Sequence, residues 1–424
     1  MDKFKPDKVD IENILDHNTN SEYFSLFKQG LEQYKYLNYT EASTTFKSLI
    51  DKFPNIADAY INYGNAQFEL SNEDEALSNW IKAREVDKYC INSYVNVGNF
   101  YLAQNKIKEG IKELKQAFLI NPFNEVALIN LAVSYEKLND KRNAFLLYEF
   151  FLASSRNRSS MDYRNVFKKV SAHKLNAIEH LKKGLILQRK KNYRKALQCY
   201  FDSIKIYPNY SKTYLNVGNL CFRIEKYKAA TEYWLESYKL NPHNSNLCLN
   251  LAMAYEKLGN IVDAYCFYYL FIRKSQGNNS AEVLNARKRI PKLNEKLGLN
   301  IDNSKVYREE IDQLLKDKDF ELAIIKLENL FVLTNEWELK EKANKLKLET
   351  NILFKASEFA LEIGKKLKAE GKQEKALNSF KTAKNLWPDS YFKDEADLLI
   401  KECRMLIANS ITAIIKTDTE ANVS

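Results

Sequence analysis

The chain has 424 residues, a net charge of +10 and 45% hydrophobic residues. No apolar run approaches the roughly 18–20 residues that a membrane-spanning helix needs, and the first residues lack the apolar core of a signal peptide. The six cysteines show no C-x-x-C spacing, so we expect reduced thiols in a cytoplasmic protein rather than disulfides or a zinc site.

A period of 34 residues runs through most of the chain. Each unit has small residues at positions 8 and 20 and a bulky residue at position 24, as in Gly64, Ala76 and Trp80. Small residues let two antiparallel helices approach closely, and the bulky residue fills the gap. The units begin near Tyr23, Ala57, Ile91, Glu125, Ala177, Ser211 and Ser245. Prolines 54, 122, 208, 242 and 388 share one late column, where proline ends the second helix of a pair.

This pattern resembles the tetratricopeptide repeat, a helix–turn–helix unit, over residues 23–278 apart from an insert at 159–176. The resemblance implies an all-α fold, a right-handed α-solenoid in which each unit buries its apolar face only against its neighbours. It also implies that the first helices line the concave surface of the solenoid.

A second period of 120 residues indicates a duplicated module. YVNVGN at 94–99 returns as YLNVGN at 214–219, and NLAVSYEKL at 130–138 returns as NLAMAYEKL at 250–258. We therefore predict a three-repeat module with a basic junction helix at 57–176 and its copy at 177–296. The first repeat, 23–56, follows a partly disordered segment, 1–22.

The region 297–424 is expected to hold degenerate repeats and a capping helix. A loose unit is predicted at about 304–337, a charged helix at 338–356, a regular unit at 357–390 and the cap at 391–416. Solenoid ends need a cap because the terminal face is otherwise bare.

The sequence offers no catalytic motif. It contains neither G-x-G-x-x-G nor a phosphate-binding G-x-x-x-x-G-K-S/T loop, and its four histidines form no H-E-x-x-H motif. We predict that the chain is not an enzyme and has no catalytic residues, no metal and no cofactor.

Asparagines recur at positions 6 and 9 of the repeat, which lie on one face of the first helix. An amide can pair with both groups of a peptide backbone, so this face is a candidate site for an extended peptide. The alternative is that the amides support the neighbouring repeat. Lys182 interrupts the asparagines and would suit an acidic residue of the ligand. The candidate peptide-binding residues are Asn62, Asn65, Asn96, Asn99, Asn130, Lys182, Asn216, Asn219 and Asn250.

Positive charge is concentrated in residues 156–195, which hold thirteen basic and two acidic residues. Such a cluster can dock an acidic segment, nucleic acid or an anionic surface, although charged runs are usually solvated helix faces. The candidate basic patch consists of Arg156, Arg158, Arg164, Lys168, Lys169, Lys190, Lys191 and Arg194.

The sequence thus favours a scaffold or adaptor that binds an extended peptide or helix of a protein partner in its concave groove. The alternative function is a basic helical-repeat binder of nucleic acid or an anionic surface through residues 156–195. The surplus of aromatic residues is also compatible with a homodimer contact.

Overall fold

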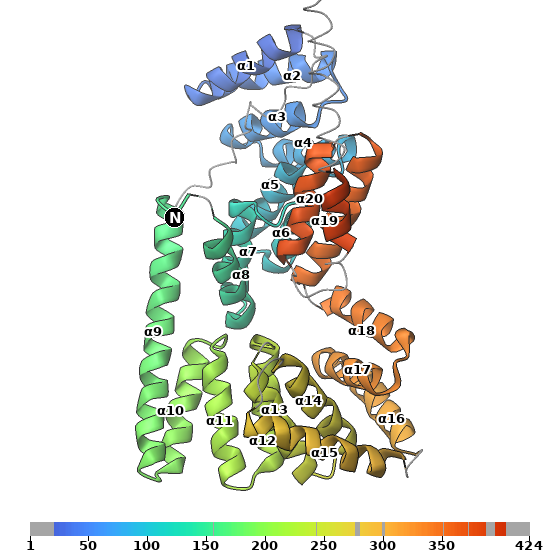
Figure 1. The fold of residues 1–424 in the computed structure, drawn as a ribbon. Helices are drawn as coiled ribbons and strands as arrows, with labels where there is room; N and C mark the ends of the chain where they lie inside the picture. The colour runs from blue at the N-terminus through green and yellow to red at the C-terminus, as the bar shows by residue number, and fades with distance from the viewer. Residues whose placement is uncertain are drawn as a thin grey trace, which may run out of the picture. The chain divides into compact units, whose positions relative to one another are not determined.

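The computed structural model describes residues 21–155, 157–242, 244–275, 280–298, 302–350, 352–371, 373–386 and 395–403. Every regular element within these ranges is an α-helix (Figure 1). The predicted all-α repeat fold is therefore confirmed. The chain divides into two compact units, unit 1 (Met1–Asn157 and Ala356–Ser424) and unit 2 (Arg158–Lys355). Of the segment 1–22 predicted to be partly disordered, residues 1–20 lie outside the described residues, and Ser21 and Glu22 belong to the helix Ser21–Lys35.

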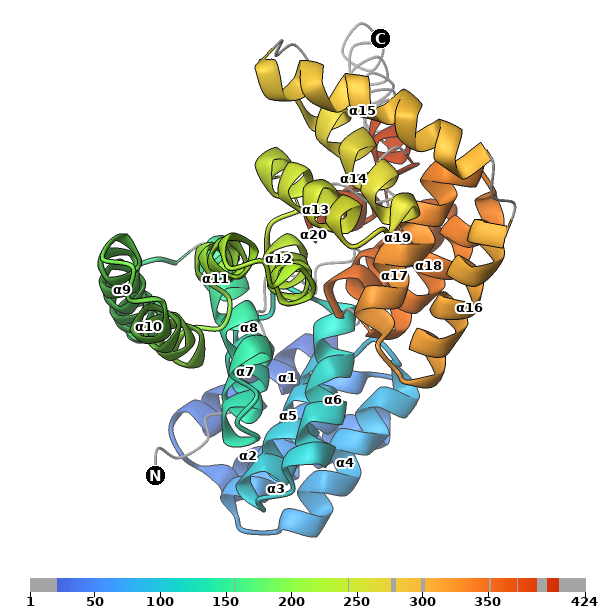
Figure 2. The ribbon, with the colours of Figure 1, turned by 90° about the horizontal axis from the view of Figure 1, so that it is seen from below.

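Unit 1 is a series of helical hairpins, each packed on the next (Figure 2). The hairpins are α1 (Ser21–Lys35) with α2 (Tyr39–Lys52), α3 (Ala57–Glu69) with α4 (Glu73–Val86), α5 (Ile91–Ala103) with α6 (Ile107–Ile120), and α7 (Glu125–Lys137) with α8 (Lys141–Ser154). The unit also takes in most of α19 (Ile352–Ala369) and α20 (Gln373–Leu386). Residues 395–403 of the expected cap are helical, and the rest of 391–416 lies outside the described ranges.

Unit 2 begins with the long helix α9 (Met161–Arg189), which packs against α10 (Tyr193–Ile206). Then come α11 (Ser211–Arg223), α12 (Tyr227–Leu240), α13 (Ser245–Lys257), α14 (Ile261–Lys274), α15 (Ala281–Gly298), α16 (Asp302–Lys316), α17 (Phe320–Thr334) and α18 (Trp337–Thr350). The boundary expected between 176 and 177 falls inside α9, because the junction segment continues into the first helix of the next repeat without a break.

The small residues at position 8 of the repeat pack against the bulky residues at position 24 in the core. A Cβ atom added to Gly218 would lie 2.4 Å from Cδ1 of Trp234, and one added to Gly64 would lie 2.7 Å from the Trp80 ring. Gly30, Gly98, Gly184 and Gly364 face the bulky residue of their own hairpins in the same way. The sixteen-residue spacing read from the sequence is therefore the contact that closes each hairpin.

The turn within each hairpin is also repeated. Ser71, Asn105 and Asn139 have positive φ angles at intervals of 34 residues, as do Lys191, Glu225 and Gly259 in unit 2. The backbone N–H of Asn72 donates to the backbone carbonyl of Gln67, and this bond closes α3, the first helix of its hairpin, with a Schellman-type turn. The second helices end two residues before the repeated prolines, so proline stops the chain from continuing the helix.

The repeat that opens unit 2 differs from the others on the face that stacks on a preceding hairpin. Positions 3, 7 and 10 are buried in α3, α5, α7, α11 and α13. In α9 these positions are Glu179, Lys183 and Ile186, and all three are exposed, Ile186 at 52%. The first repeat of the chain likewise exposes Ser25, Gln29 and Glu32 there. Polar residues at stacking positions are what the first hairpin of a stack requires.

A buried ionic network joins α14 to α16 and α17 in unit 2. The carboxylate of Asp263 accepts hydrogen bonds from Nζ of Lys326 at 2.9 Å, Nδ2 of Asn329 at 2.9 Å and the hydroxyl of Tyr307. Asp263 and Lys326 are only 1% and 3% exposed. Burial, followed by the charge of Asp263, holds the pKa of Tyr307 well above its usual value, so this phenol stays a donor.

We expect Gly218→Ala to lower the free energy of unfolding by about 1–3 kcal/mol, because the added methyl overlaps the Trp234 ring. Urea unfolding followed by circular dichroism measures this change. In a Trp234→Ala background the same substitution should cost less, because the ring that the added methyl would overlap is absent. An equal cost in both backgrounds would contradict the proposed contact.

Lys326→Met should destabilise unit 2 by about 3–5 kcal/mol, since it leaves the buried carboxylate of Asp263 without its cation. Lys342→Met is the matched control, because Lys342 pairs with Asp312 at 3.5 Å on the surface and should contribute less than about 1 kcal/mol. Similar unfolding midpoints for the two variants would show that the buried pair is not stabilising.

Candidate functional site

The asparagines at positions 6 and 9 form hydrogen bonds from one repeat to the next. Nδ2 of Asn96 donates to Oδ1 of Asn65 at 2.8 Å, and Nδ2 of Asn130 donates to Oδ1 of Asn99 at 2.7 Å. Asn250 and Asn219 make the same bond in unit 2 at 3.3 Å. A position 9 amide thus accepts from the position 6 amide of the following repeat, 31 residues later.

The two tryptophans of the bulky column use the same acceptors. Nε1 of Trp80 donates to Oδ1 of Asn65 at 2.9 Å, and Nε1 of Trp234 donates to Oδ1 of Asn219 at 3.1 Å. An indole N–H needs a partner when it is buried, and asparagine supplies one. The pairing of asparagine at position 9 with tryptophan at position 24 is the sequence signal for this role, and it is separate from the 34-residue period.

Burial separates the candidate residues into two groups. Asn62, Asn65, Asn96 and Asn99 of unit 1 are buried, Asn96 at 1% exposure. Asn130, Asn216, Asn219 and Asn250 are half-buried, and Lys182 is exposed. Asn62 and Asn216 bond the carbonyls of Asp58 and Lys212 in their own helices. The half-buried amides therefore remain the ones that a ligand could reach without moving the repeats apart.

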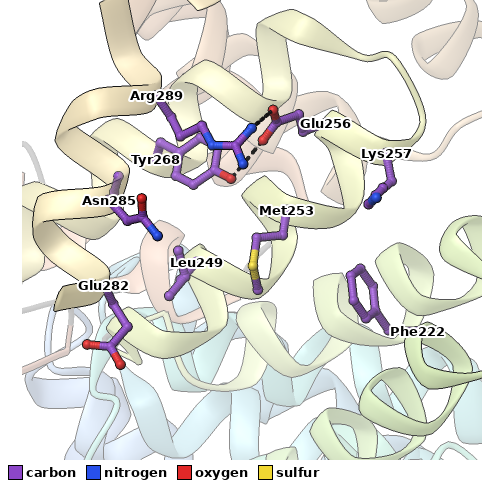
Figure 3. A pocket seen from close by; sticks show the side chains of 10 residues that line it. Phe222, Leu249, Met253, Glu256, Lys257, Tyr268, Glu282, Asn285 and Arg289 are labelled. Atoms are coloured by element: carbon purple, nitrogen blue, oxygen red, sulfur yellow. Dashed lines mark hydrogen bonds and ion pairs between the residues drawn. The ribbon is translucent and has the colours of Figure 1, made fainter.

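Two adjoining cavities lie along the first helices of unit 2. One, of about 420 Å³, is lined by Gln188, Asn219, Phe222, Arg223, Trp234, Asn250 and Met253. The other, of about 430 Å³, shares Phe222 and Met253 and continues over Leu249 to α15 (Figure 3). Together they make an open groove in which Phe222, Leu249 and Met253 form an apolar floor between polar side chains.

The wall beside Tyr268 is held by a small polar cluster. Arg289 on α15 lies 2.5 Å from a carboxylate oxygen of Glu256, and the Tyr268 hydroxyl donates to the same carboxylate at 2.9 Å (Figure 3). Burial, with the hydrogen bond to Glu256, raises the pKa of Tyr268 well above its usual value, so the hydroxyl remains a donor. The cluster fixes α15 at one side of the groove.

The basic patch lies along α9 and at the start of α10. Arg158, Arg164, Lys168, Lys190, Lys191 and Arg194 are exposed, and Lys169 is half-buried. The rings of Tyr163 and Phe167 stack beside them with centroids 6.2 Å apart. Arg156 lies outside the described residues.

Within the described ranges, no group of three histidine, cysteine or acidic residues is arranged to hold a metal ion. In the same ranges, no helix combines the length and the apolar character needed to cross a membrane.

Comparison with known proteins places these features in a family. Models of the tetratricopeptide repeat match residues 27–87 and 91–124. A human relative, tetratricopeptide repeat protein 6, is 23% identical over 187 residues, which is 43% of this chain and 32% of that protein. The chain therefore spans about a third of that relative's length.

Several solved structures of tetratricopeptide repeat proteins are similar to the chain, at low overall overlap. A tetratricopeptide repeat protein from Parabacteroides merdae is 17% identical with a TM-score of 0.30, covering 65% of this chain and 99% of its own. The P58(IPK) TPR domain is 11% identical with a TM-score of 0.26, and the match covers 92% of this chain and 99% of that domain. The first TPR of Spaghetti (RPAP3), bound to an HSP90 peptide, is 22% identical with a TM-score of 0.27. The match covers 29% of this chain and 98% of that one. TM-scores this low carry no information on function.

Asn65→Leu should destabilise unit 1 by about 2–4 kcal/mol, because it leaves two buried donors, on Trp80 and Asn96, without an acceptor. Asn216→Ala is the control, since Asn216 bonds only a carbonyl of its own helix and should change the unfolding free energy by less than about 1 kcal/mol. Guanidinium unfolding of the two variants measures the difference, and equal midpoints would exclude the bridging role.

Proposed function

Because this chain belongs to the tetratricopeptide repeat family, we propose that it is a protein-interaction scaffold. It holds an extended segment of a partner protein along the first helices of its repeats. The observation that carries this proposal is the groove of unit 2, where an apolar floor and half-buried amides lie together.

The amides of Asn219 and Asn250 supply the polar contacts in this groove, and Asn216 lies three residues before Asn219 on α11. Each amide has two donor hydrogens and an acceptor oxygen, and the hydrogen bonds that these amides make within and between repeats use only part of this capacity. Each remaining bond to a peptide backbone contributes about 0.5–1.5 kcal/mol, so the apolar floor must provide much of the affinity. We include Lys182 in the same role, facing an acidic residue, and we give Asn130 the corresponding role on the first helices of unit 1.

The four buried amides of unit 1 serve the ligand indirectly in this proposal. Asn65, Asn96 and Asn99 fix the register of successive first helices, and so the spacing of the side chains that a peptide meets, while Asn62 bonds within its own helix. Oδ1 of Asn96 and Nδ2 of Asn99 have no partner among the described residues. A small outward shift of these two side chains would offer an acceptor and a donor to one peptide unit.

The cysteines support a non-catalytic protein in the cytoplasm. All six are free thiols. Burial raises the pKa of Cys90 to about 12, and it also raises the pKa of Cys248. A thiol that stays protonated at neutral pH is a poor nucleophile, so these residues fill the core rather than react.

The second candidate function is binding of nucleic acid or another anionic surface through residues 156–195. It is favoured by the exposed cations of α9 and by the stacked pair of Tyr163 and Phe167, of which Phe167 is largely exposed. Phosphate contacts would make such binding fall steeply as salt rises, whereas binding through amides and apolar contacts would hold.

The test of the scaffold function is crosslinked co-purification of the tagged full chain from its own cells. We expect one protein partner to be retained at raised salt and lost with the double variant Asn216→Ala, Asn250→Ala. The control is Asn79→Ala, which removes a similar amide, bonded to its own helix at 2.8 Å, from a second helix. Recovery of nucleic acid with every variant, and its release by salt, would reject the groove in favour of the basic patch.

A further inference from the structure

A column of cations runs along one edge of the unit 2 groove. Arg189, Arg223 and Lys257 are the residues at position 13 of successive repeats, and they are the last residues of α9, α11 and α13. All three are exposed. Cations complement the dipole at a helix C-terminus, and unit 1 has Lys35 and Lys137 at the same position. The fold does not require a cation in every repeat, because unit 1 also has Glu69 and Ala103 there.

The cavity against α15 lies beside this edge. Its floor is formed by Phe222, Leu249 and Met253, and its far side by Ala286. At about 430 Å³ it can hold one bulky apolar side chain together with part of a peptide backbone. Figure 3 shows Met253 and Leu249 between the polar cluster of Glu256 and Arg289 at one end and Glu282 with Asn285 at the other.

The positively and negatively charged side chains of the groove are not evenly distributed along it. Arg289 is neutralised by Glu256, which leaves the ammonium of Lys257 and the guanidinium of Arg223 as the cations facing a ligand. Glu282, at the opposite end of the cavity, would repel an acidic group. An acidic ligand is therefore directed to the edge with the cation column.

The residues of this cavity recur in the sequence 120 positions earlier. Glu256, Lys257, Tyr268 and Asn285 correspond to the identical residues Glu136, Lys137, Tyr148 and Asn165, and Leu249, Glu282 and Arg289 correspond to the similar residues Ile129, Asp162 and Lys169. Exposed neighbours outside the lining have changed, as in Ala281 for Met161, Leu284 for Arg164 and Arg287 for Phe167, although Lys288 matches Lys168. The chemistry of these lining positions was thus retained when nearby surface positions diverged.

From these observations, and resting on the scaffold function above, we propose that the unit 2 groove binds an extended acidic segment of a partner protein. One bulky apolar side chain of that segment fills the cavity between α13, α14 and α15, and its acidic residues pair with Arg189, Arg223 and Lys257. The hydrogen bond between Asn219 and Asn250 shows that the first helices α11 and α13 are neighbours. Packed helices are about 8–10 Å apart and an extended chain advances about 3.3 Å per residue, so acidic residues at every third position suit this column.

The experiment uses the full chain and three fluorescein-labelled ten-residue peptides. The first has glutamate at every third position and one central leucine. The second has alanine in place of the leucine, and the third has lysine in place of each glutamate. Fluorescence polarisation at physiological and raised salt gives the affinities.

We expect the first peptide to bind, the alanine peptide to bind about tenfold more weakly and the lysine peptide not to bind. Met253→Gln should weaken the first peptide by a similar factor, and the triple variant Arg189→Gln, Arg223→Gln, Lys257→Gln by roughly tenfold. Two controls should leave binding unchanged. Met161→Gln alters an exposed methionine outside the groove, and Lys305→Gln, Lys316→Gln, Lys345→Gln removes the same number of exposed charges away from both the groove and the basic patch.

Equal binding of the acidic and lysine peptides, or unchanged affinity in the groove variants, would overturn the proposal, as would the absence of binding to any peptide. If a native partner is lost with Asn216→Ala, Asn250→Ala but is unaffected by Met253→Gln and by the triple variant, the scaffold function stands and only the acidic-segment inference fails.

Discussion

The rest of the structure depends on the contact between a small residue in the first helix of each repeat and a bulky residue sixteen positions later. The contact sets the distance between the two helices, because a methyl group at Gly184 or Gly218 would already overlap Tyr200 or Trp234. Once the hairpin is closed, its remaining apolar residues can be buried only by the next hairpin. The stack, and the surface formed by successive first helices, follow from this one distance.

The asparagines connect this packing to binding. An amide at position 9 accepts from the next repeat and, in two repeats, from the indole of the bulky column, so one side chain ties hairpin closure to repeat stacking. The residue type alone does not show whether such an asparagine stabilises the fold or binds a ligand. The exposure of its side chain decides between these two roles. The exposure is greater in unit 2, where Asn219 and Asn250 border the cavity.

Particular side chains determine where each stack of repeats begins and ends. Polar residues on the stacking face of α9 allow a second stack to begin there, much as the first repeat begins the first stack. At the other end of unit 2, α15 packs on α14, and the network of Asp263 and Lys326 joins α14 to α17. A buried ion pair of this kind adds little net stability over an apolar contact, but it allows few alternative partners, which suits a position where the repeat pattern ends.

The sequence by itself determined the repeat, the hairpin and the residues that close it, because these depend on contacts between positions at fixed, short separations. The starts of α3, α5, α7, α11 and α13 coincide with the units read from the glycines. Only the tertiary structure decided that α9 runs unbroken through the junction, that Asn96 is enclosed while Asn250 borders a cavity, and that Asp263 meets Lys326 across 63 residues. Those outcomes depend on which side chains from distant segments share the same space, and a local period carries no information about that.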